Sequence, residues 1–428
     1  MFAQASALRL SRLGIHYGWA VVALTFLASL TTAGAISLPA TLILPLANEF
    51  GWTTEQISGA LALRLLVYGL TAPFAAALID RFGLRRTIVA AMALTAAGAL
   101  LTLRINALWQ LTLFWGVFVG FGAGLTALSM TAAAATRWFV SRRGLAVGVL
   151  AASAAAGQLV FLPLAAWLAE RYGWRAALAP PLVGVAIAGV LALLFMADRP
   201  ADVGQTALGE SDKPEPAEAP TPRSALAALA EISGSGAFWI LAATFFICGL
   251  STNGLIQTHF VAFCADFDVG AIAAASSLAA MGALDFVGAI GSGWLADRYD
   301  NRALLFVYYG LRGLSLLYLP GSTISIFGLT AFTAFYGLDW VATVPPTVRL
   351  TASAFGRERA GSAFGWIYAA HMLGAAVAAY GAGYSRSVLQ SYLPAFYAAG
   401  ALCLVAASLA WLIEKRPAAA GAPARAAP

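Results

Sequence analysis

Twelve long runs of apolar residues follow one another along the chain. Each is about as long as the ~20 predominantly apolar residues that a helix needs to cross the hydrocarbon core of a bilayer. Overall, 61% of the 428 residues are hydrophobic and 10% are charged, whereas an ordinary soluble protein carries about 25% charged residues. This balance excludes a soluble enzyme, a disordered regulator and a nucleic-acid-binding domain. Because the runs are continuous rather than alternating, they predict membrane-spanning helices and not a β-barrel.

The predicted fold is therefore an all-α integral membrane protein with 12 transmembrane helices in two six-helix bundles. The first six spans are expected near 17–46, 54–79, 87–104, 107–136, 143–169 and 174–196. The second six are expected near 237–265, 270–296, 303–320, 323–349, 359–384 and 389–413. A Pro-, Glu-, Asp- and Ala-rich segment separates the two groups and is typical of a linker. We expect an N-terminal bundle over 1–196, a linker over 197–235, a C-terminal bundle over 236–414 and a disordered tail over 415–428.

The basic residues indicate the orientation. The net charge is +6, and most of the 25 Lys and Arg residues fall in loops that share the side of the N-terminus. By the positive-inside rule both termini and the linker are expected in the cytoplasm. The protein is expected in a cell membrane, namely a bacterial inner membrane. The basic excess is thus a topology signal, and no nucleic-acid partner is expected. Arg9 and Arg12 resemble the start of a signal peptide, but the long run that follows favours an uncleaved span.

The cysteines do not form a recognisable framework. Cys248, Cys264 and Cys403 lie inside apolar runs at no metal-ligand spacing. We interpret them as small core residues, and expect no disulfide, metal or cofactor. A monomer is expected.

A short charged motif occurs twice, about half the chain apart. Residues 80–86 read Asp-Arg-Phe-Gly-Leu-Arg-Arg after the second run, and residues 297–302 read Asp-Arg-Tyr-Asp-Asn-Arg after the eighth. Internal repeats of this kind are typical of secondary transporters, in which two similar bundles rock about a central site.

The first copy resembles the loop motif of the major facilitator superfamily, and the six-plus-six division with a central linker fits the same family. The second copy is degenerate, with Asp300 at the glycine position. The resemblance implies a latch on the cytoplasmic side, in which Asp80 accepts hydrogen bonds from a helix N-terminus or an arginine. Ordinary topology charges are the alternative. The residues of this cytoplasmic gate motif are Asp80, Arg85, Arg86, Asp297 and Arg298.

Four shorter motifs resemble the monocarboxylate-transporter and oxalate/formate-antiporter branch: Tyr17-Gly18-Trp19, Glu49-Phe50-Gly51-Trp52, Arg143-Gly144-Leu145-Ala146-Val147-Gly148 and Gly173-Trp174-Arg175. Two departures stand against them. In span 8 of that branch an aspartate is followed four residues later by a substrate-binding arginine, whereas Asp285 here is followed by Ala289. Animal members have a lysine after a proline in span 1, and here Ala40 follows Pro39. The anion-binding cations of the branch therefore do not carry over.

Charged side chains within the spans persist only when they face the bundle interior, usually with a partner. Arg64, near the middle of the second span, is our candidate for the anion site, with a pair to an acid or to backbone carbonyls as the alternative. Arg312 lies on a span that the family fold places at the periphery, and is expected to form a structural ion pair with Asp285 or Asp339. Asp285 is expected to carry a coupling proton, with a static salt bridge as the alternative.

Further polar residues lie in the second half. Asp339 precedes Pro345-Pro346, which are expected to break or bend the tenth span, and broken helices often mark sites or gates. Asn253 and Gln257 are four residues apart and share one face of the seventh span. The expected substrate contacts, besides Arg64, are Asn253, Gln257, His259, Asp339 and His371. Hydrogen bonding between packed helices is the alternative for these residues.

These features predict a secondary active transporter that moves a small organic anion, resembling a monocarboxylate, by alternating access with a proton as coupling ion. The chain has no phosphate-binding loop of the Walker type, so ATP is not the expected driver. A drug or metabolite efflux antiporter of the same fold is the alternative. Efflux members have Gly-Pro after spaced glycines in span 5, whereas residues 161–163 here are Phe-Leu-Pro. No span pairs metal ligands or a nucleophile with a base, so an enzyme is not expected.

Overall fold

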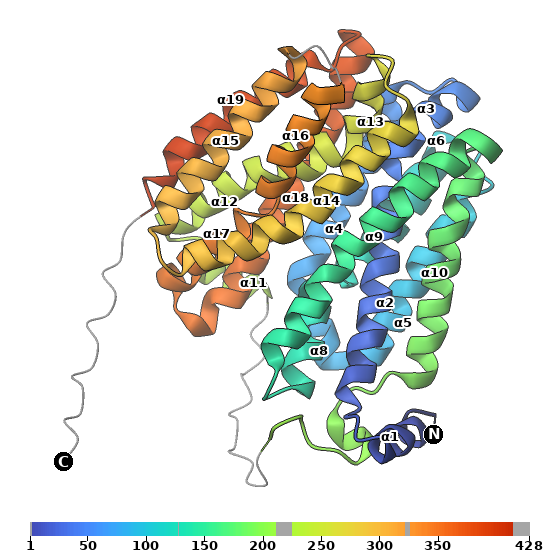
Figure 1. The fold of residues 1–428 in the computed structure, drawn as a ribbon, viewed down its shortest axis with the longest axis vertical. Coiled ribbons are helices and arrows are strands. Elements are labelled where there is room, and N and C mark those ends of the chain that lie inside the picture. The colour runs from blue at the N-terminus through green and yellow to red at the C-terminus, as the bar shows by residue number, and fades with distance from the viewer. Residues whose placement is uncertain (1, 127, 211–224, 322–325, 414–428) are drawn as a thin grey trace.

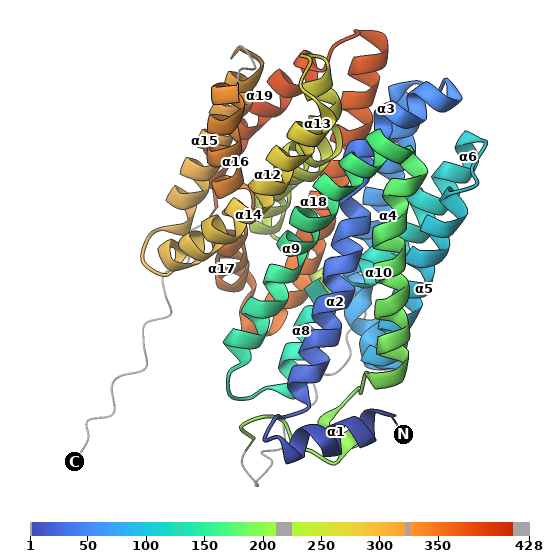
Figure 2. The same ribbon diagram turned by 45° about the vertical axis from the view of Figure 1, so that its right-hand side comes forward.

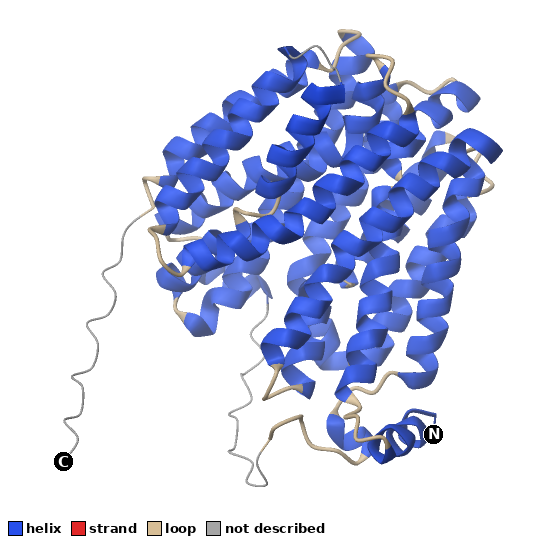
Figure 3. Ribbon diagram, in the orientation of Figure 1, coloured by secondary structure: helices blue, strands red, loops and turns tan. Residues whose placement is uncertain are grey.

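The computed structural model describes residues 2–126, 128–210, 225–321 and 326–413. In these ranges the chain is helical almost throughout (Figure 3), and the only β-type pairing is an isolated bridge between Phe139 and Leu208. Both views place α1 (Phe2–Arg12) at one end of the molecule, and α3 (Pro39–Phe50) and α13 (Gln257–Ala265) at the other (Figures 1 and 2). We call these the α1 end and the far end.

The helices of the first half follow the predicted spans. They are α2 (Gly18–Ser37) with α3 (Pro39–Phe50), α4 (Thr54–Phe82), α5 (Leu84–Thr102), the composite of α6 (Leu108–Leu111), η1 (Thr112–Val119), α7 (Gly120–Leu125) and α8 (Leu128–Trp138), then α9 (Arg143–Tyr172) and α10 (Trp174–Phe195). The segment η1 is wound as a π-helix. Such segments are rare, and in proteins they are often found at functional sites.

The second half repeats the pattern. Its helices are the composite of α12 (Gly236–Gly249), η3 (Leu250–Ile256) and α13 (Gln257–Ala265), then α14 (Ala271–Ala296), α15 (Asn301–Gly321), α16 (Ile326–Asp339), α17 (Val344–Phe355), α18 (Arg357–Val388) and α19 (Leu393–Ala410). In the part of the chain that the structure describes, eleven helices are long and apolar enough to cross a membrane.

The tenth predicted span is the one missing from those eleven, because it is interrupted. Helix α16 ends at Asp339 and α17 begins at Val344, so neither piece is long enough alone. Pro345 and Pro346 stand in the first turn of α17, where they cannot continue the hydrogen-bond ladder of α16. The predicted break is therefore present, and the twelve-span architecture stands with one span in two pieces. We call residues 340–343 the helix break.

Three short helices were not predicted. They are α1, η2 (Pro200–Val203) and α11 (Ala225–Ile232), of which the last two lie in the predicted linker. They are too short to span a bilayer, so the search for apolar runs does not detect them. The middle of that linker, 211–224, and the predicted tail, 415–428, lie outside the described residues.

The two copies of the charged motif form different turns. Helix α4 ends at Phe82 and α5 begins at Leu84, so Gly83 alone makes the turn, with φ of 88°. Only glycine adopts that conformation readily. In the second copy α14 ends at Ala296 and α15 begins at Asn301. The longer turn needs no residue with positive φ, which explains how Asp300 can replace the glycine.

The two halves meet mainly along α4 with α18 and α9 with α14, and α3 also contacts α13. At the far end, the Glu55 backbone N–H donates to Ser387 Oγ over 2.9 Å, and Tyr380 Oη donates to Glu55 Oε1 over 2.5 Å. Gln158 Nε2 donates to the Leu278 carbonyl over 3.0 Å. These contacts hold the halves together near the far end.

Towards the α1 end the halves separate around a cavity. It has a volume of about 370 Å³ and lies between α4, α8 and α18. We call it the vestibule. Its lining includes Ala72 and Asp80 from α4, Arg137 from α8, and Gly365 and Tyr368 from α18.

Candidate functional site

Arg64 is a buried cation with unmet hydrogen-bonding capacity. It lies on α4 about 15 Å from the start of the helix at 1.5 Å per residue, and its relative exposure is 1%. Its Nε and Nη1 atoms have no hydrogen-bond partner among the described residues. The backbone of α7 packs directly on the backbone of α4 at Arg64, because Gly120 has no side chain to hold the helices apart. Burying an unpaired charge is costly, so Arg64 is a candidate for binding an anion.

A pair of tyrosines separates Arg64 from the vestibule. Tyr68 lies one turn beyond Arg64 on α4, and Ala72, one turn further, already lines the vestibule. Tyr68 Oη lies 2.9 Å from Tyr368 Oη on α18, with the two rings nearly perpendicular. This hydrogen bond joins the two halves at the inner wall of the vestibule. A solute that enters from the α1 end meets the tyrosines before it meets Arg64.

The tyrosine pair continues into a set of hydrogen bonds in the second half. The Tyr368 ring stacks on His371, with centroids 5.6 Å apart. His371 Nε2 lies 2.9 Å from Asn253 Oδ1, and Asn253 Nδ2 donates to Gln257 Oε1 over 2.6 Å. Asn253 lies in the π-helical segment η3. We call Tyr68, Tyr368, His371, Asn253 and Gln257 the histidine group.

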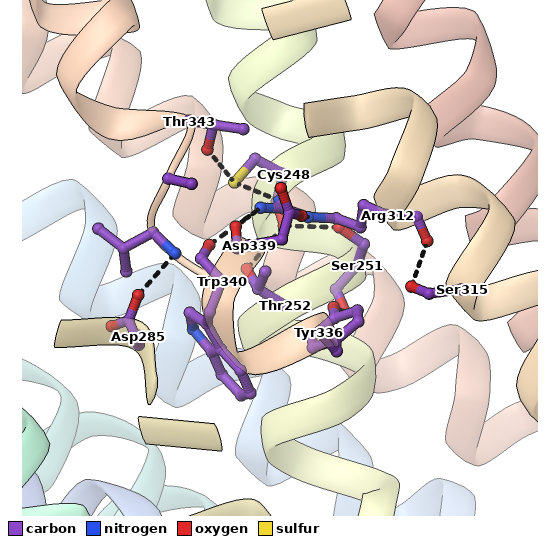
Figure 4. Close-up of polar contacts among 12 residues, drawn as sticks. Cys248, Ser251, Thr252, Asp285, Arg312, Ser315, Tyr336, Asp339, Trp340 and Thr343 are labelled. Atoms are coloured by element: carbon purple, nitrogen blue, oxygen red, sulfur yellow. Dashed lines mark hydrogen bonds and ion pairs between the residues drawn. The ribbon is translucent and has the colours of Figure 1, made fainter. Parts of the chain in front are cut away.

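Arg312 has a full set of partners, in contrast to Arg64. Figure 4 shows its guanidinium group directed at Asp339 and Cys248. Nε donates to Asp339 Oδ2 over 2.7 Å, and Nη2 donates to the carbonyl oxygens of Asp339 and Trp340 over 2.5 and 3.0 Å. Of the two expected partners, Asp339 is the one that forms the pair. Arg312 thereby also satisfies carbonyls left free where α16 ends.

Asp285 lies at the other side of the helix break (Figure 4). Its Oδ1 accepts a hydrogen bond from the Val341 backbone N–H over 2.8 Å. Asp285 and Arg312 thus hold the break from two helices, α14 and α15. We call Arg312, Asp339 and Asp285 the arginine group.

Cys248 makes polar contacts that the sequence did not predict. Its Sγ atom accepts from Arg312 Nη1 over 3.0 Å and lies 3.3 Å from Thr343 Oγ1 in the helix break. The prediction of a simple core cysteine is incomplete, because the residue is buried but not in purely apolar packing. No spacing in the sequence could reveal this, since Cys248 and its two partners lie on three different spans.

A second cavity opens on the outer side of the second half. It has a volume of about 520 Å³, lies between α15 and α16, and includes Arg312 and Asp339 in its wall. Most of its lining is apolar and exposed, as at Leu314 and Phe335. Asp339 is therefore occupied by Arg312 and faces the outer side of the half, away from the vestibule.

His259 is not brought together with the other candidates. Its Nε2 lies 2.8 Å from the Ala379 carbonyl oxygen, and its ring packs near Tyr392 towards the far end. Its observed contacts are those of a packing residue between α13 and α18.

The gate-motif acids pair within their own halves. Asp80 forms an ion pair with Arg137 at 2.6 Å, and Asp297 pairs with Arg349. The two motif copies follow the second and eighth spans, and the two arginines lie near the ends of the fourth and tenth spans. The second half therefore repeats the ion-pair arrangement of the first. Arg137 and Arg349 were not among the predicted motif residues, although the repeat itself could have indicated them.

The motif arginines have local contacts. The Arg85 backbone N–H donates to Asp198 Oδ1 over 2.7 Å, and its side chain donates to the Leu193 carbonyl. Arg298 lies over the Trp294 ring, with Cζ 4.1 Å from the centroid. Arg86 is exposed. Among the described residues, no group of three or more His, Cys, Asp or Glu side chains could hold a metal ion.

Comparison with known proteins agrees with this architecture. The family model of the Major Facilitator Superfamily matches residues 24–379, with a further match over 287–428. The chain is 27% identical to monocarboxylate transporter 13 of Bos taurus over 91% of this chain and 87% of the relative. It is 26% identical to the uncharacterised MFS-type transporter YcxA of Bacillus subtilis over 88% of this chain and 89% of that one.

Among solved structures, the crystal structure of a D-xylose-proton symporter is similar in fold. Its TM-score is 0.71 at 14% identity, over 92% of this chain and 97% of that one. The chain belongs to the Major Facilitator Superfamily. Within it, the chain is related to the monocarboxylate transporters.

Proposed function

We propose that this protein is a secondary active transporter of a small organic anion of the monocarboxylate type, with a proton as coupling ion. The observation that carries the proposal is Arg64, a buried guanidinium with two nitrogen atoms free of partners among the described residues. A carboxylate supplies charged acceptor oxygens, to which a guanidinium forms strong charge-assisted hydrogen bonds. The relationship to proteins named monocarboxylate transporters supports the same substrate class.

The anion reaches Arg64 through the vestibule. For this the hydrogen bond between Tyr68 and Tyr368 opens, and both hydroxyl groups become available to the substrate. Asn253, Gln257 and His371 belong to the same hydrogen-bonded group, and they present the second half's polar side chains to the substrate. His259 and Asp339 have no part in this contact, because their partners lie elsewhere.

Alternating access proceeds by rocking of the two halves. The contacts of Glu55 and Gln158 keep the far end closed, while the vestibule opens at the α1 end. With both termini in the cytoplasm, this is the inward-facing arrangement. The pairs of Asp80 with Arg137 and Asp297 with Arg349 remain within their halves in it, and are free to exchange partners when the α1 end closes.

Charge neutralisation gives the reason for coupling. With Asp285 ionised, the arginine group contains one cation and two anions, whereas Arg64 is an unpaired cation. A proton on Asp285 makes the arginine group neutral, and a carboxylate bound to Arg64 balances the charge of that residue. Since unbalanced buried charge is costly, the doubly loaded carrier is the form in which the halves move most readily.

The test is uptake by purified protein in proteoliposomes, with a panel of radiolabelled mono- and dicarboxylates and an imposed pH gradient. Wild-type protein should accumulate at least one monocarboxylate. Arg64→Ala should abolish uptake and leave the yield of folded protein unchanged. Arg104→Ala, which alters an exposed arginine of the same half, is the matched control and should transport normally. Normal uptake by Arg64→Ala would remove Arg64 from the site.

A further inference from the structure

Among the described residues, the histidine group and the arginine group approach each other at Cys248 and Gly249 of α12. The former reaches from α4 across α18 to η3 and α13, and the latter joins α14, α15 and the end of α16. Cys248 stands on α12, directly before η3. It is therefore on the same span as Asn253, while its thiol bonds to Arg312 and Thr343.

Cys248 also lies alongside His371. Its neighbour Gly249 packs so closely on the carbonyl of His371 that no side chain would fit there. Two consecutive residues of α12 thus meet His371 of the histidine group and, through the Cys248 sulfur, the guanidinium of the arginine group and the helix break.

The chemistry of the thiol suits this position. A thiol is a weak donor and a weak acceptor, so it can accept from a guanidinium and exchange a hydrogen bond with a hydroxyl at the same time. Alanine can do neither. Serine can do both with a smaller atom. In contrast, Cys264 on the same span is buried, and its thiol forms no hydrogen bond with the residues that the structure describes.

From these contacts we propose that Cys248 is the positioning residue through which the anion site and the proton site influence each other. The proposal rests on the proposed function. A change at His371 on substrate binding alters its packing on Gly249, and the sulfur atom of the adjacent Cys248 holds Arg312 Nη1 and Thr343 beside the helix break. The break in turn presents the Val341 N–H to Asp285. Cys248 is not expected to touch the substrate or the proton.

The experiment compares two transport modes of the same proteoliposomes: counterflow of a labelled monocarboxylate without a pH gradient, and accumulation driven by one. Cys248→Ala should lower the accumulation ratio by about tenfold, the factor for losing a hydrogen bond to a charged group. Its counterflow rate should stay within about twofold of wild type, a difference of well under 1 kcal/mol. Cys248→Ser should restore most of the accumulation.

Cys264→Ala is the matched control and should leave both modes unchanged. If Cys248→Ala and Cys264→Ala give the same ratio of accumulation to counterflow, Cys248 has no coupling role. The same conclusion follows if Cys248→Ser is as impaired as Cys248→Ala, or if both modes fall together. Failure of the proposed function gives a different result, because wild-type protein would then show no counterflow of any monocarboxylate.

Discussion

The two buried arginines of this protein are alike in burial and opposite in surroundings. Arg64 and Arg312 are each 1% exposed, and each lies within a membrane span, one in each half. Arg312 binds a carboxylate, two carbonyls and a sulfur atom. Arg64 has two nitrogen atoms without a partner among the described residues. The difference teaches that burial alone does not distinguish a structural charge from a ligand-binding one. What differs between the two arginines is the number of unmet donors.

The surroundings of each arginine follow from the helices that carry them. Arg312 faces the point where α16 ends, and a helix end offers free carbonyls. Arg64 lies where α7 packs on the backbone of α4 at Gly120, and its Nε and Nη1 atoms have no partner among the described residues. On the proposed function, the first half keeps this cation for an anionic ligand, whereas the second half uses its cation to hold a broken helix.

Removal of each arginine provides the largest expected contrast. Arg312→Ala leaves Asp339 buried and unpaired, and we expect it to destabilise the protein by about 3–5 kcal/mol, as for other broken buried pairs. Arg64→Ala removes an unpaired charge, and we expect its stability to equal or exceed that of wild type. The measurement is thermal unfolding of both variants in the same detergent.

The double variant Arg312→Met with Asp339→Leu serves as control, since it removes both charges and retains most of the volume. It should recover much of the lost stability. Equal destabilisation by Arg64→Ala and Arg312→Ala would contradict the comparison, because it would mean that Arg64 also has a structural partner.

Asp285→Asn tests whether the arginine group carries the coupling proton while the anion binds at Arg64. The amide can still accept the hydrogen bond from Val341, but it cannot take up a proton at neutral pH. We expect accumulation driven by a pH gradient to be lost and counterflow of the same anion to persist. The measurement is both transport modes in one preparation of proteoliposomes. Accumulation that survives this substitution would place the coupling proton at another residue.

Much of the fold can be predicted from the sequence, because crossing a bilayer requires a long apolar run and a proline pair cannot continue a helix. The twelve spans and the break before Pro345 follow from these two facts. The degenerate motif at 297–302 is explained only by the structure, since the sequence does not show that the turn there is longer than the single residue Gly83.

The candidate site could be predicted only in part, for a physical reason. Sequence patterns show which residues share a helix face, as for Asn253 and Gln257, which are indeed bonded to each other. They do not show how two spans are rotated against each other. For that reason the choice of Asp339 over Asp285 as partner of Arg312, and the contacts of Cys248 with Arg312 and Thr343, required coordinates.

The smallest expected effect concerns the tyrosines beside Arg64. Tyr68→Phe removes the hydrogen bond to Tyr368 and leaves the ring packing in place. A neutral hydrogen bond contributes about 1 kcal/mol, so we expect the KM for the anion to change by about fivefold, with pH coupling intact. Tyr368→Phe should have the same effect, and the double variant should add little, because both act on one bond. Tyr318→Phe, at an exposed position on α15, is the control. A loss of pH coupling in Tyr68→Phe would show that residues beside Arg64 also take part in proton coupling. The two arginines would then differ in their partners but not in their roles.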